Sequence, residues 1–283
     1  MSRMLVVGAG LTGGACASLL RGAGLGRVEI WDKARGAGGR MSTSRGTRDA
    51  ACTADLGAQY ITFEAERSEP RRSFYEELLS HGILQQLTAP IEGMVVKKGS
   101  CNYVAPQGIS SVVKYYLKQS AGADVFYEQH VTHICLRDGK WEVSRKTGPP
   151  ELFDIVILTM PVPQILHLQG DIVNKSPEIG PSVVVHTTVT FGSEYLNSDP
   201  TEVQQLILSY LERIMPSLPK PSSIKCQKWR YSQVTKAVPS SLGQMILHTQ
   251  PLLVCGGDGF TRSNFDGCID SAMSLAEVVK SHL

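Results

Sequence analysis

The first residues of the chain alternate between apolar runs and a glycine-rich turn. Residues 4–7 are all apolar, which predicts a strand buried on both faces. The run stops at the glycine-rich residues 8–13, and residues 15–21 continue with the pattern of a helix. A second apolar run, residues 28–31, predicts another strand, which ends at Asp32. The order of strand, glycine turn, helix and strand predicts the beginning of a parallel α/β sheet.

The rest of the chain carries further helix and strand patterns. The spacing of apolar residues predicts helices over residues 68–79, 108–121, 199–214 and 266–280, the third of which opens with a capping box, D-P-T-E. Apolar and β-branched runs predict strands over residues 124–127, 131–136, 140–144, 154–159, 183–189 and 252–255. Asp138 and Gly139 predict a hairpin turn, and the polar residues 171–182 are interpreted as a junction.

The composition is that of a globular protein with balanced charge. Of the 283 residues 42% are hydrophobic, which is enough for the core of one large domain or two interleaved ones. Because 28 Lys and Arg stand against 26 Asp and Glu, nucleic acid is not an expected partner. The apolar runs are much shorter than the ~20 residues that cross a bilayer, so no membrane partner is expected. Residues 1–20 lack the continuous apolar core of a cleavable signal, which is compatible with a cytoplasmic protein.

The cysteines and histidines follow neither a metal pattern nor a disulfide pattern. The seven cysteines are scattered, odd in number and contain no C-x-x-C, so free thiols are expected. The seven histidines have no metal-ligand spacing. No metal is therefore expected.

The glycine turn is the first candidate for chemistry. Gly8, Gly10 and Gly13 form a G-x-G-x-x-G motif, in which the glycines allow a tight turn and admit a pyrophosphate against the backbone amides. Asp32 follows Gly13 by nineteen residues, at the end of the second strand, where a carboxylate can accept hydrogen bonds from ribose hydroxyls. The pattern predicts a dinucleotide site, and a glycine turn without a ligand is the alternative.

Two further motifs distinguish flavin from nicotinamide dinucleotides. Gly38-Gly39-Arg40 follows the second strand, and Gly257-Asp258 precedes the last helix. Together with the glycine turn they resemble the FAD-containing amine-oxidase-like family, in which such an arginine lies at the pyrophosphate and such an aspartate at the sugar-phosphate arm of the flavin. A solvated basic loop around Arg40 and a helix-capping role for Asp258 are the alternatives.

Four stretches narrow the resemblance to one branch of that family: residues 53–62, 90–95, 228–235 and 255–266. Members of this branch are FAD-dependent oxidases of abnormal dihydro-NAD(P), the 2- and 6-dihydro isomers, which they convert to NAD(P)+ while oxygen becomes hydrogen peroxide. They have also been described as secreted proteins that act on catecholamines. The resemblance therefore implies a small-molecule dihydro-NAD(P) substrate, oxygen as the acceptor, and secretion.

The resemblance also implies an α/β fold, in which an FAD-binding Rossmann-type domain is combined with a smaller, interleaved α+β substrate domain. The FAD-binding domain is expected from residues 1–62, 106–160 and 246–283, and an abridged substrate domain from residues 63–105 and 161–245. The opening strand, turn and helix belong to the first of these domains.

The family's phosphate and ribose contacts transfer to residues of the two glycine motifs and their neighbours. Thr12 and Arg40, the latter presented by Gly39, would hold the FAD phosphates, and Asp32 would hold the adenosine ribose. Monoamine oxidases bond their flavin to the cysteine of a Ser-Gly-Gly-Cys motif, which this sequence lacks. Noncovalent FAD is therefore expected.

The flavin side of the site rests on residues further along the chain. Gln59 and Tyr60 would line the cleft, and Asp258 would bind the ribityl end; for Tyr60, a place in the core is the alternative. Trp229 is expected to pack in the interior rather than to line a substrate site. Oxidation of a dihydropyridine removes a hydride and no proton, so no catalytic side chain is expected and the flavin performs the hydride transfer.

One departure from the family concerns the substrate domain. Family members carry several strands between the segments that match residues 170–172 and 178–181, whereas only residues 173–177 intervene here. We therefore expect an incomplete substrate side with exposed apolar edges. A catalytically impaired or non-catalytic shortened form and a secreted signalling ligand stay open as alternatives. An amine oxidase is a weaker rival, because Phe265 stands where the amine cage often has a tyrosine.

Overall fold

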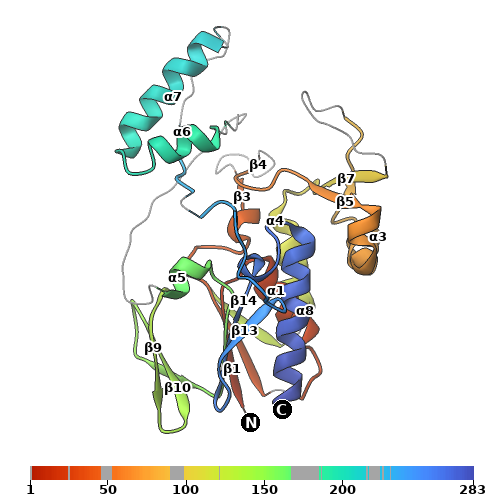
Figure 1. Cartoon of the computed structure of the whole chain (residues 1–283), viewed down its shortest axis with the longest axis vertical. Helices are drawn as coiled ribbons and strands as arrows, with labels where there is room; N and C mark the ends of the chain where they lie inside the picture. Colours follow the sequence, from red (N-terminus) through yellow and green to blue (C-terminus); the bar gives the residue numbers. More distant parts are fainter. Residues whose placement is uncertain are drawn as a thin grey trace. The chain divides into compact units, whose positions relative to one another are not determined.

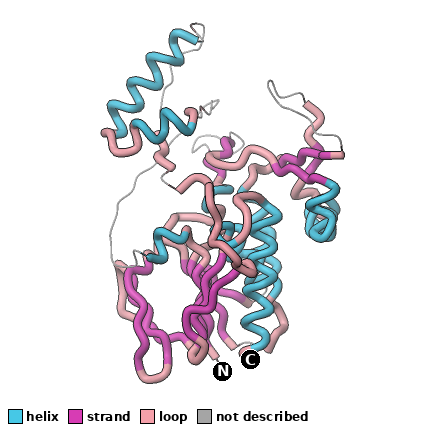
Figure 2. The backbone as a smooth tube through the Cα atoms, in the orientation of Figure 1, coloured by secondary structure: helices cyan, strands magenta, loops and turns pink. Residues whose placement is uncertain are grey.

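The computed structural model places most of the chain in defined helices, strands and loops (Figure 1, Figure 2). The described residues are 2–24, 26–45, 53–89, 99–120, 122–166, 185, 187–214, 216, 224, 226–229 and 231–283. The chain divides into two compact units. The first comprises Met1–Thr43, Asp55–Ile172 and Gln233–Leu283, and the second comprises Ser44–Ala54 and Val173–Ser232. The division into an FAD-binding and a substrate domain stays a prediction.

A six-stranded sheet lies at the centre of the first unit, in the order β13-β14-β12-β1-β2-β8. Its strands are β1 (Arg3–Val7), β2 (Arg27–Trp31), β8 (Ala123–Phe126), β12 (Ile155–Leu158), β13 (Gln244–His248) and β14 (Leu252–Gly256). Neighbours pair in parallel except at the edge, where β13 is antiparallel to β14. The predicted parallel α/β sheet is confirmed.

Strand β1 occupies the middle of the sheet because both of its faces are apolar. Met4 and Val6 belong to one core cluster, Leu5 and Val7 to the cluster on the opposite face, and none of the four is more than 5% exposed. Val7 pairs with the last residue of β2 and with the last residue of β12. The carboxyl ends of three neighbouring strands therefore lie side by side, which is where open α/β sheets bind their ligands.

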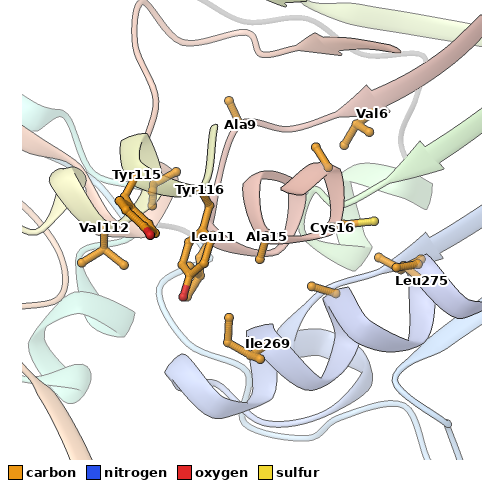
Figure 3. Close-up of a cluster of buried hydrophobic side chains, with 14 of the residues drawn as sticks. Val6, Ala9, Leu11, Ala15, Cys16, Val112, Tyr115, Tyr116, Ile269 and Leu275 are labelled. Atoms are coloured by element: carbon orange, nitrogen blue, oxygen red, sulfur yellow. The ribbon is translucent and has the colours of Figure 1, made fainter. Parts of the chain in front are cut away.

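Three helices pack against one face of this sheet: α1 (Leu11–Leu19), α4 (Ser110–Gln119) and α8 (Phe265–Ser281). Figure 3 shows where they meet, with Ala15 and Cys16 of α1, Tyr116 of α4 and Leu275 of α8 in one buried cluster. All residues of α1 from Leu11 to Ala17 are buried, so its run of small side chains lets the neighbouring helices approach closely. The predicted last helix is confirmed, and the first begins at Leu11, four residues earlier than expected.

A three-stranded meander covers the opposite face of the sheet. It consists of β9 (Val131–Arg137), β10 (Lys140–Arg145) and β11 (Glu151–Phe153), in the order β11-β10-β9. Trp141, Val143 and Phe153 pack with Trp31 in the second core cluster. The predicted hairpin turn is confirmed, since Asp138 and Gly139 both have positive φ, 50° and 73°.

A second antiparallel sheet, in the order β5-β7-β6, was not expected from the sequence pattern. Its strands are β5 (Ile61–Glu64), β6 (Gln85–Gln86) and β7 (Ser100–Val104), with α2 (Ala65–Ser68) and α3 (Arg72–Ser80) between them. The helix predicted over residues 68–79 is split by a 3₁₀ turn, Glu69–Arg71, because Pro70 cannot donate a helical hydrogen bond. Helix α5 (Val162–Leu166) completes the first unit, and the short strands β3 (Thr43–Arg45) and β4 (Thr53–Asp55) each include residues of both units.

The described helices of the second unit are α6 (Val189–Glu194) and α7 (Pro200–Ile214). The N-cap of the predicted capping box is confirmed for α7, because Asp199 Oδ1 accepts from Thr201 N at 2.8 Å and from Glu202 N at 3.3 Å. The strand predicted over residues 183–189 is wrong where the structure describes it: residues 185, 187 and 188 form no strand, and Thr188 caps α6 by accepting from Phe191 N. A local cap thus overrides the β propensity. The junction at 171–182 and the motif at 90–95 lie outside the described residues.

Candidate cofactor-binding site

The glycine turn joins β1 to α1 in a geometry that only glycine permits. Gly8 has φ +117°, and a Cβ there would lie 2.7 Å from Thr159 Oγ1. A Cβ at Gly13 would lie 2.0 Å from the backbone oxygen of Gly8. Both glycines are therefore required for the packing of the turn against the first turn of α1.

Gly10 has a different role, because nothing lies within 4 Å of a Cβ built there. It is the N-cap residue of α1, no side chain caps this helix end, and the first turn holds no acidic residue. Uncapped amides at a helix N-terminus present donors and partial positive charge to an anion. The open space above Gly10 is thus suited to a phosphate group.

Asp32 lies where the sequence placed it, directly after β2. Its Oδ2 accepts from Ala9 N at 2.6 Å and its Oδ1 accepts from Ala34 N at 2.7 Å. Burial raises the pKa of Asp32, and these two backbone hydrogen bonds act against that rise. The carboxylate therefore fastens the glycine turn, a role that the sequence did not reveal, while its remaining lone pairs can accept from ribose hydroxyls.

Arg40 and Asp258 are in direct contact. Arg40 Nη1 donates to Asp258 Oδ2 at 2.6 Å, Nη2 donates to Oδ1 at 2.7 Å, and Ser263 Oγ donates to Oδ2 at 2.9 Å. Burial works against the charge on the guanidinium, but the hydrogen bonds and charge of Asp258 outweigh it and raise the pKa of Arg40. Arg40 is therefore an ion-paired residue and not part of a solvated basic loop.

Asp258 is also not the cap of the last helix. It begins the 3₁₀ helix Asp258–Phe260, whereas the N-cap of α8 is Asn264, whose Oδ1 accepts from Gly267 N at 2.8 Å. The carboxylate is only 5% exposed and needs compensation for its charge. Arg40 provides that compensation.

The sequence reasoning missed a cysteine in this cluster. Burial raises the pKa of Cys268 to about 11; the charge of Asp258 adds to this rise, and a hydrogen bond from Thr12 and the charge of Arg40 oppose it. Cys268 therefore links Thr12, which is 5% exposed, to the Arg40–Asp258 pair: it interacts with the hydroxyl of Thr12 and with the charges of both members of the pair. The only local signal was that position 268 lies in the first turn of the helix after the Gly-Asp motif.

Gln59 and Tyr60 lie on the segment that packs on the backbone of Arg40. Ala58 N donates to Arg40 O at 3.0 Å, and a Cβ at Gly57 would lie 2.0 Å from the same oxygen. Gln59 Nε2 donates to Asp55 O at 2.7 Å, which turns its side chain back onto its own loop. Tyr60 is 39% exposed, so the alternative that it is a core aromatic is wrong.

A buried carboxylate that the sequence reasoning did not single out lies near the start of α8. Asp266 accepts from Tyr75 Oη at 2.8 Å and from Ser68 Oγ at 2.6 Å. Burial first, and the nearby charge of Asp266 second, raise the pKa of Tyr75, which keeps the phenol as a donor. Phe265 is 7% exposed and its ring lies 4.9 Å from that of Tyr75.

Trp229 is a half-buried residue of the second unit.

The helices of the described residues include none that is long and apolar enough to cross a bilayer. In the same residues, no group of three or more His, Cys, Asp or Glu side chains could hold a metal ion.

The sheet, the glycine turn and Asp32 define a Rossmann-type dinucleotide-binding protein. Accordingly, residues 6–78 match the family described as NAD(P)-binding Rossmann-like domain. Mouse renalase is 48% identical over 344 residues, and the comparison covers 100% of this chain and 100% of the mouse protein. The chain belongs to the renalase family and is a flavin oxidoreductase.

One solved structure supports the fold independently of close sequence similarity. A crystal structure from Exiguobacterium sp. 255-15, provisionally assigned as a protoporphyrinogen oxidase, covers 100% of this chain and 99% of its own with a TM-score of 0.62. Its sequence identity is 12%, so the similarity concerns the fold alone.

The mouse relative is longer than this chain. The comparison extends over 344 positions and covers both proteins completely, whereas this chain has 283 residues. The mouse protein therefore carries internal residues that have no counterpart here. The sequence placed this difference at residues 173–177, which lie outside the described residues.

Proposed function

We propose that this protein is an FAD-dependent oxidase of abnormal dihydro-NAD(P), the 2- and 6-dihydro isomers, that yields NAD(P)+ and hydrogen peroxide. The observation that carries the proposal is the open, uncapped helix end at Gly10 in a chain of the renalase family. Such a site accepts the diphosphate of a dinucleotide. The secretion described for the family is proposed with it.

The residues of the site fit FAD. Thr12, Gly39 and Arg40 would surround the diphosphate, since Gly39 lies against the glycine turn, with 3.7 Å between a Cβ built on it and Gly10 Cα. Asp32 would bind the adenosine ribose. The sequence has no Ser-Gly-Gly-Cys, which favours a noncovalent flavin.

The flavin end would be served by Gln59 and Tyr60, and Asp258 would belong to the cofactor site as the partner of Arg40. When bound, FAD supplies the hydride acceptor of the reaction. The protein's own task is to hold the substrate carbon at ~3 to 3.5 Å from that acceptor and to exclude competing reactions. No side chain need move a proton, because the dihydropyridine gives up only a hydride.

The first test is the cofactor. Purified protein should be yellow, and acid precipitation should release FAD into the supernatant. Colour that stays with the pellet contradicts noncovalent binding, and protein that neither is purified with FAD nor binds added FAD contradicts the proposal.

The second test is the substrate. Anaerobic mixing with 6-dihydro-NAD should bleach the bound flavin, and admission of oxygen should restore the colour and release peroxide. Ordinary NADH, which differs only in the position of the added hydrogen, is the matched control and should react much more slowly. Rapid bleaching by a catecholamine instead would overturn the substrate class.

A second candidate is a catalytically impaired or non-catalytic form, including a secreted signalling ligand. It is favoured by the internal residues that mouse renalase has and this chain lacks. Loss of substrate-positioning strands should damage hydride transfer more than dinucleotide binding. We therefore expect bleaching by 6-dihydro-NAD to be much slower than in mouse renalase, and an equal rate would contradict this expectation.

A further inference from the structure

Arg40 and Asp258 form an ion pair, although the family resemblance assigns Arg40 to the diphosphate of FAD and Asp258 to its ribityl end. Arg40 and Asp258 are 218 positions apart in the sequence and form two parallel hydrogen bonds, at 2.6 and 2.7 Å. The side chain of Arg40 is 32% exposed, whereas that of Asp258 is 7% exposed. The carboxylate thus lies behind the guanidinium, and Arg40 is the member of the pair that faces outward.

The ion pair of Arg40 and Asp258 is stabilised by several hydrogen bonds and by burial of the carboxylate. Both carboxylate oxygens of Asp258 are engaged by Arg40, and Ser263 Oγ adds a third donor at 2.9 Å. Separation would leave a carboxylate buried without its cation, which is strongly unfavourable. The guanidinium has five N–H groups and uses two for Asp258, so three are left for an incoming phosphate.

The backbone next to Arg40 fixes this side chain relative to the glycine turn. Gly38 N donates to Ala9 O at 3.0 Å, directly before the N-cap Gly10. A guanidinium held rigidly at this place by Asp258 can meet a diphosphate at the end of α1 with little loss of side-chain entropy.

We propose that Asp258 is a positioning residue, which aims Arg40 at the diphosphate and acts on the ligand only through Arg40. The inference rests on the proposed dinucleotide function and departs from the expectation that Asp258 itself binds the ribityl end of the flavin. If Asp258 positions Arg40, its loss should weaken the binding of the diphosphate. If Asp258 binds the ribityl end directly, its loss should weaken only the binding of the flavin part of FAD.

The test compares FAD with ADP, which contains the adenosine and the diphosphate but no ribityl or flavin. Dissociation constants of both ligands are measured on cofactor-stripped wild type and on Asp258→Asn. We expect both ligands to bind about ten- to a hundredfold more weakly to the variant, by the same factor, because a charge-assisted contact of Arg40 is lost from the diphosphate. Weaker FAD binding with unchanged ADP binding would overturn the inference.

A double-mutant cycle adds an independent criterion. Arg40→Met keeps the aliphatic stem and should weaken both ligands; adding Asp258→Asn to it should weaken neither any further. Effects that multiply in the double variant would place Asp258 on the ligand itself and overturn the inference. Ser263→Ala, which leaves the two bonds to Arg40 in place, is the matched control and should change either constant by less than about threefold.

Asp258→Glu provides a second test in case Asp258→Asn, which loses the buried charge, does not fold. It keeps the buried charge but shifts the carboxylate by one methylene, and the ratio of the FAD effect to the ADP effect should again be close to one. Wild type that binds ADP but not FAD would refute the proposed function and leave the inference standing. Unequal effects in a protein that binds both would refute the inference alone, and wild type that binds neither ligand refutes both.

Discussion

Two buried carboxylates lie near the start of α8, and the difference between them separates the proposed ligand site from the architecture of the fold. Asp258 and Asp266 are each 5% exposed. Asp258 is compensated by a cation, Arg40, whose side chain is partly exposed. The described donors to Asp266 are the hydroxyls of Tyr75 and Ser68, both buried, and Asp266 also lies in the first turn of the helix, where the dipole favours negative charge.

The contrast teaches that burial of a carboxylate does not by itself identify a functional residue. The cation of Asp258 keeps donors free toward the open side of the site, whereas the donors of Asp266 end inside the protein and connect α2 and α3 to α8. Loss of Asp258 should therefore appear in ligand affinity, and loss of Asp266 in the free energy of unfolding.

The glycine turn gives the largest expected effect and repeats the contrast within one motif. Gly13→Ala places a Cβ 2.0 Å from Gly8 O, a backbone atom that cannot move cheaply, so the free energy of unfolding should fall by about 3 kcal/mol or more. Gly10→Ala meets open space and should leave stability within about 1 kcal/mol. Urea unfolding measures both variants, and ADP binding should weaken at least about tenfold in Gly10→Ala because the methyl group occupies the path of the diphosphate. Equal stability of the two variants would contradict this assignment.

Asp266→Ala tests the architectural carboxylate directly. It leaves the hydroxyls of Tyr75 and Ser68 buried without their acceptor, so the free energy of unfolding should fall by about 3 kcal/mol. The matched control is Glu277→Ala, further along the same helix α8, whose side chain is exposed, and it should change the free energy of unfolding by at most about 1 kcal/mol. ADP affinity of folded Asp266→Ala should stay within about threefold of wild type. A stable variant that has lost ADP binding would reverse the roles of the two carboxylates.

The sequence predicts those features that depend on residues close together in the chain, and it does not predict those that depend on contacts between distant residues. The strands at residues 4–7 and 28–31, the glycine turn and the position of Asp32 are local patterns, and all are found as predicted. The strand at 183–189 failed because a side-chain cap at Thr188 outweighed β-branched propensity.

Features that join distant parts of the chain could not be read from such patterns. The edge strand β13 has mostly exposed side chains and carries no alternation, so no period marks it. The pairing of Arg40 with Asp258 spans 218 positions and that of Tyr75 with Asp266 spans 191. Residue type alone suggested that Arg40 and Asp258 bind a ligand, but only the fold brings them into contact.

Asp32 combines the roles of the two carboxylates compared above: like Asp266 it stabilises the fold, because it fastens the glycine turn, and like Asp258 it belongs to the proposed ligand site, where it would bind the ribose. Asp32→Ala removes the acceptor of Ala9 N and Ala34 N and should lower the free energy of unfolding by about 1 to 2 kcal/mol. FAD and ADP should both bind about tenfold more weakly, since both contain the adenosine ribose. Arg35→Ala, an exposed neighbour on the same loop, is the control and should change neither quantity appreciably. Lower stability with unchanged affinity would reduce Asp32 to an architectural residue like Asp266.

The smallest expected effect concerns Cys268, the thiol beside the Arg40–Asp258 pair. Burial and the charge of Asp258 raise the pKa of this thiol to about 11, so at pH 8 only about one thiol in a thousand is a reactive thiolate. Iodoacetamide labelling of Cys268, followed by mass spectrometry, should be slow at pH 8 and accelerate as the pH approaches 11, with Cys268→Ser identifying the labelled peptide. The unfolded thiol ionises first, near its ordinary pKa of 9.0, so this group makes the free energy of unfolding fall as the pH rises from about 9 through about 11. Asp258→Asn removes a charge that holds the pKa up and should speed labelling at pH 8, whereas Asp266→Ala should not. Equal labelling in the two variants would show that Cys268 does not sense the ligand-side carboxylate.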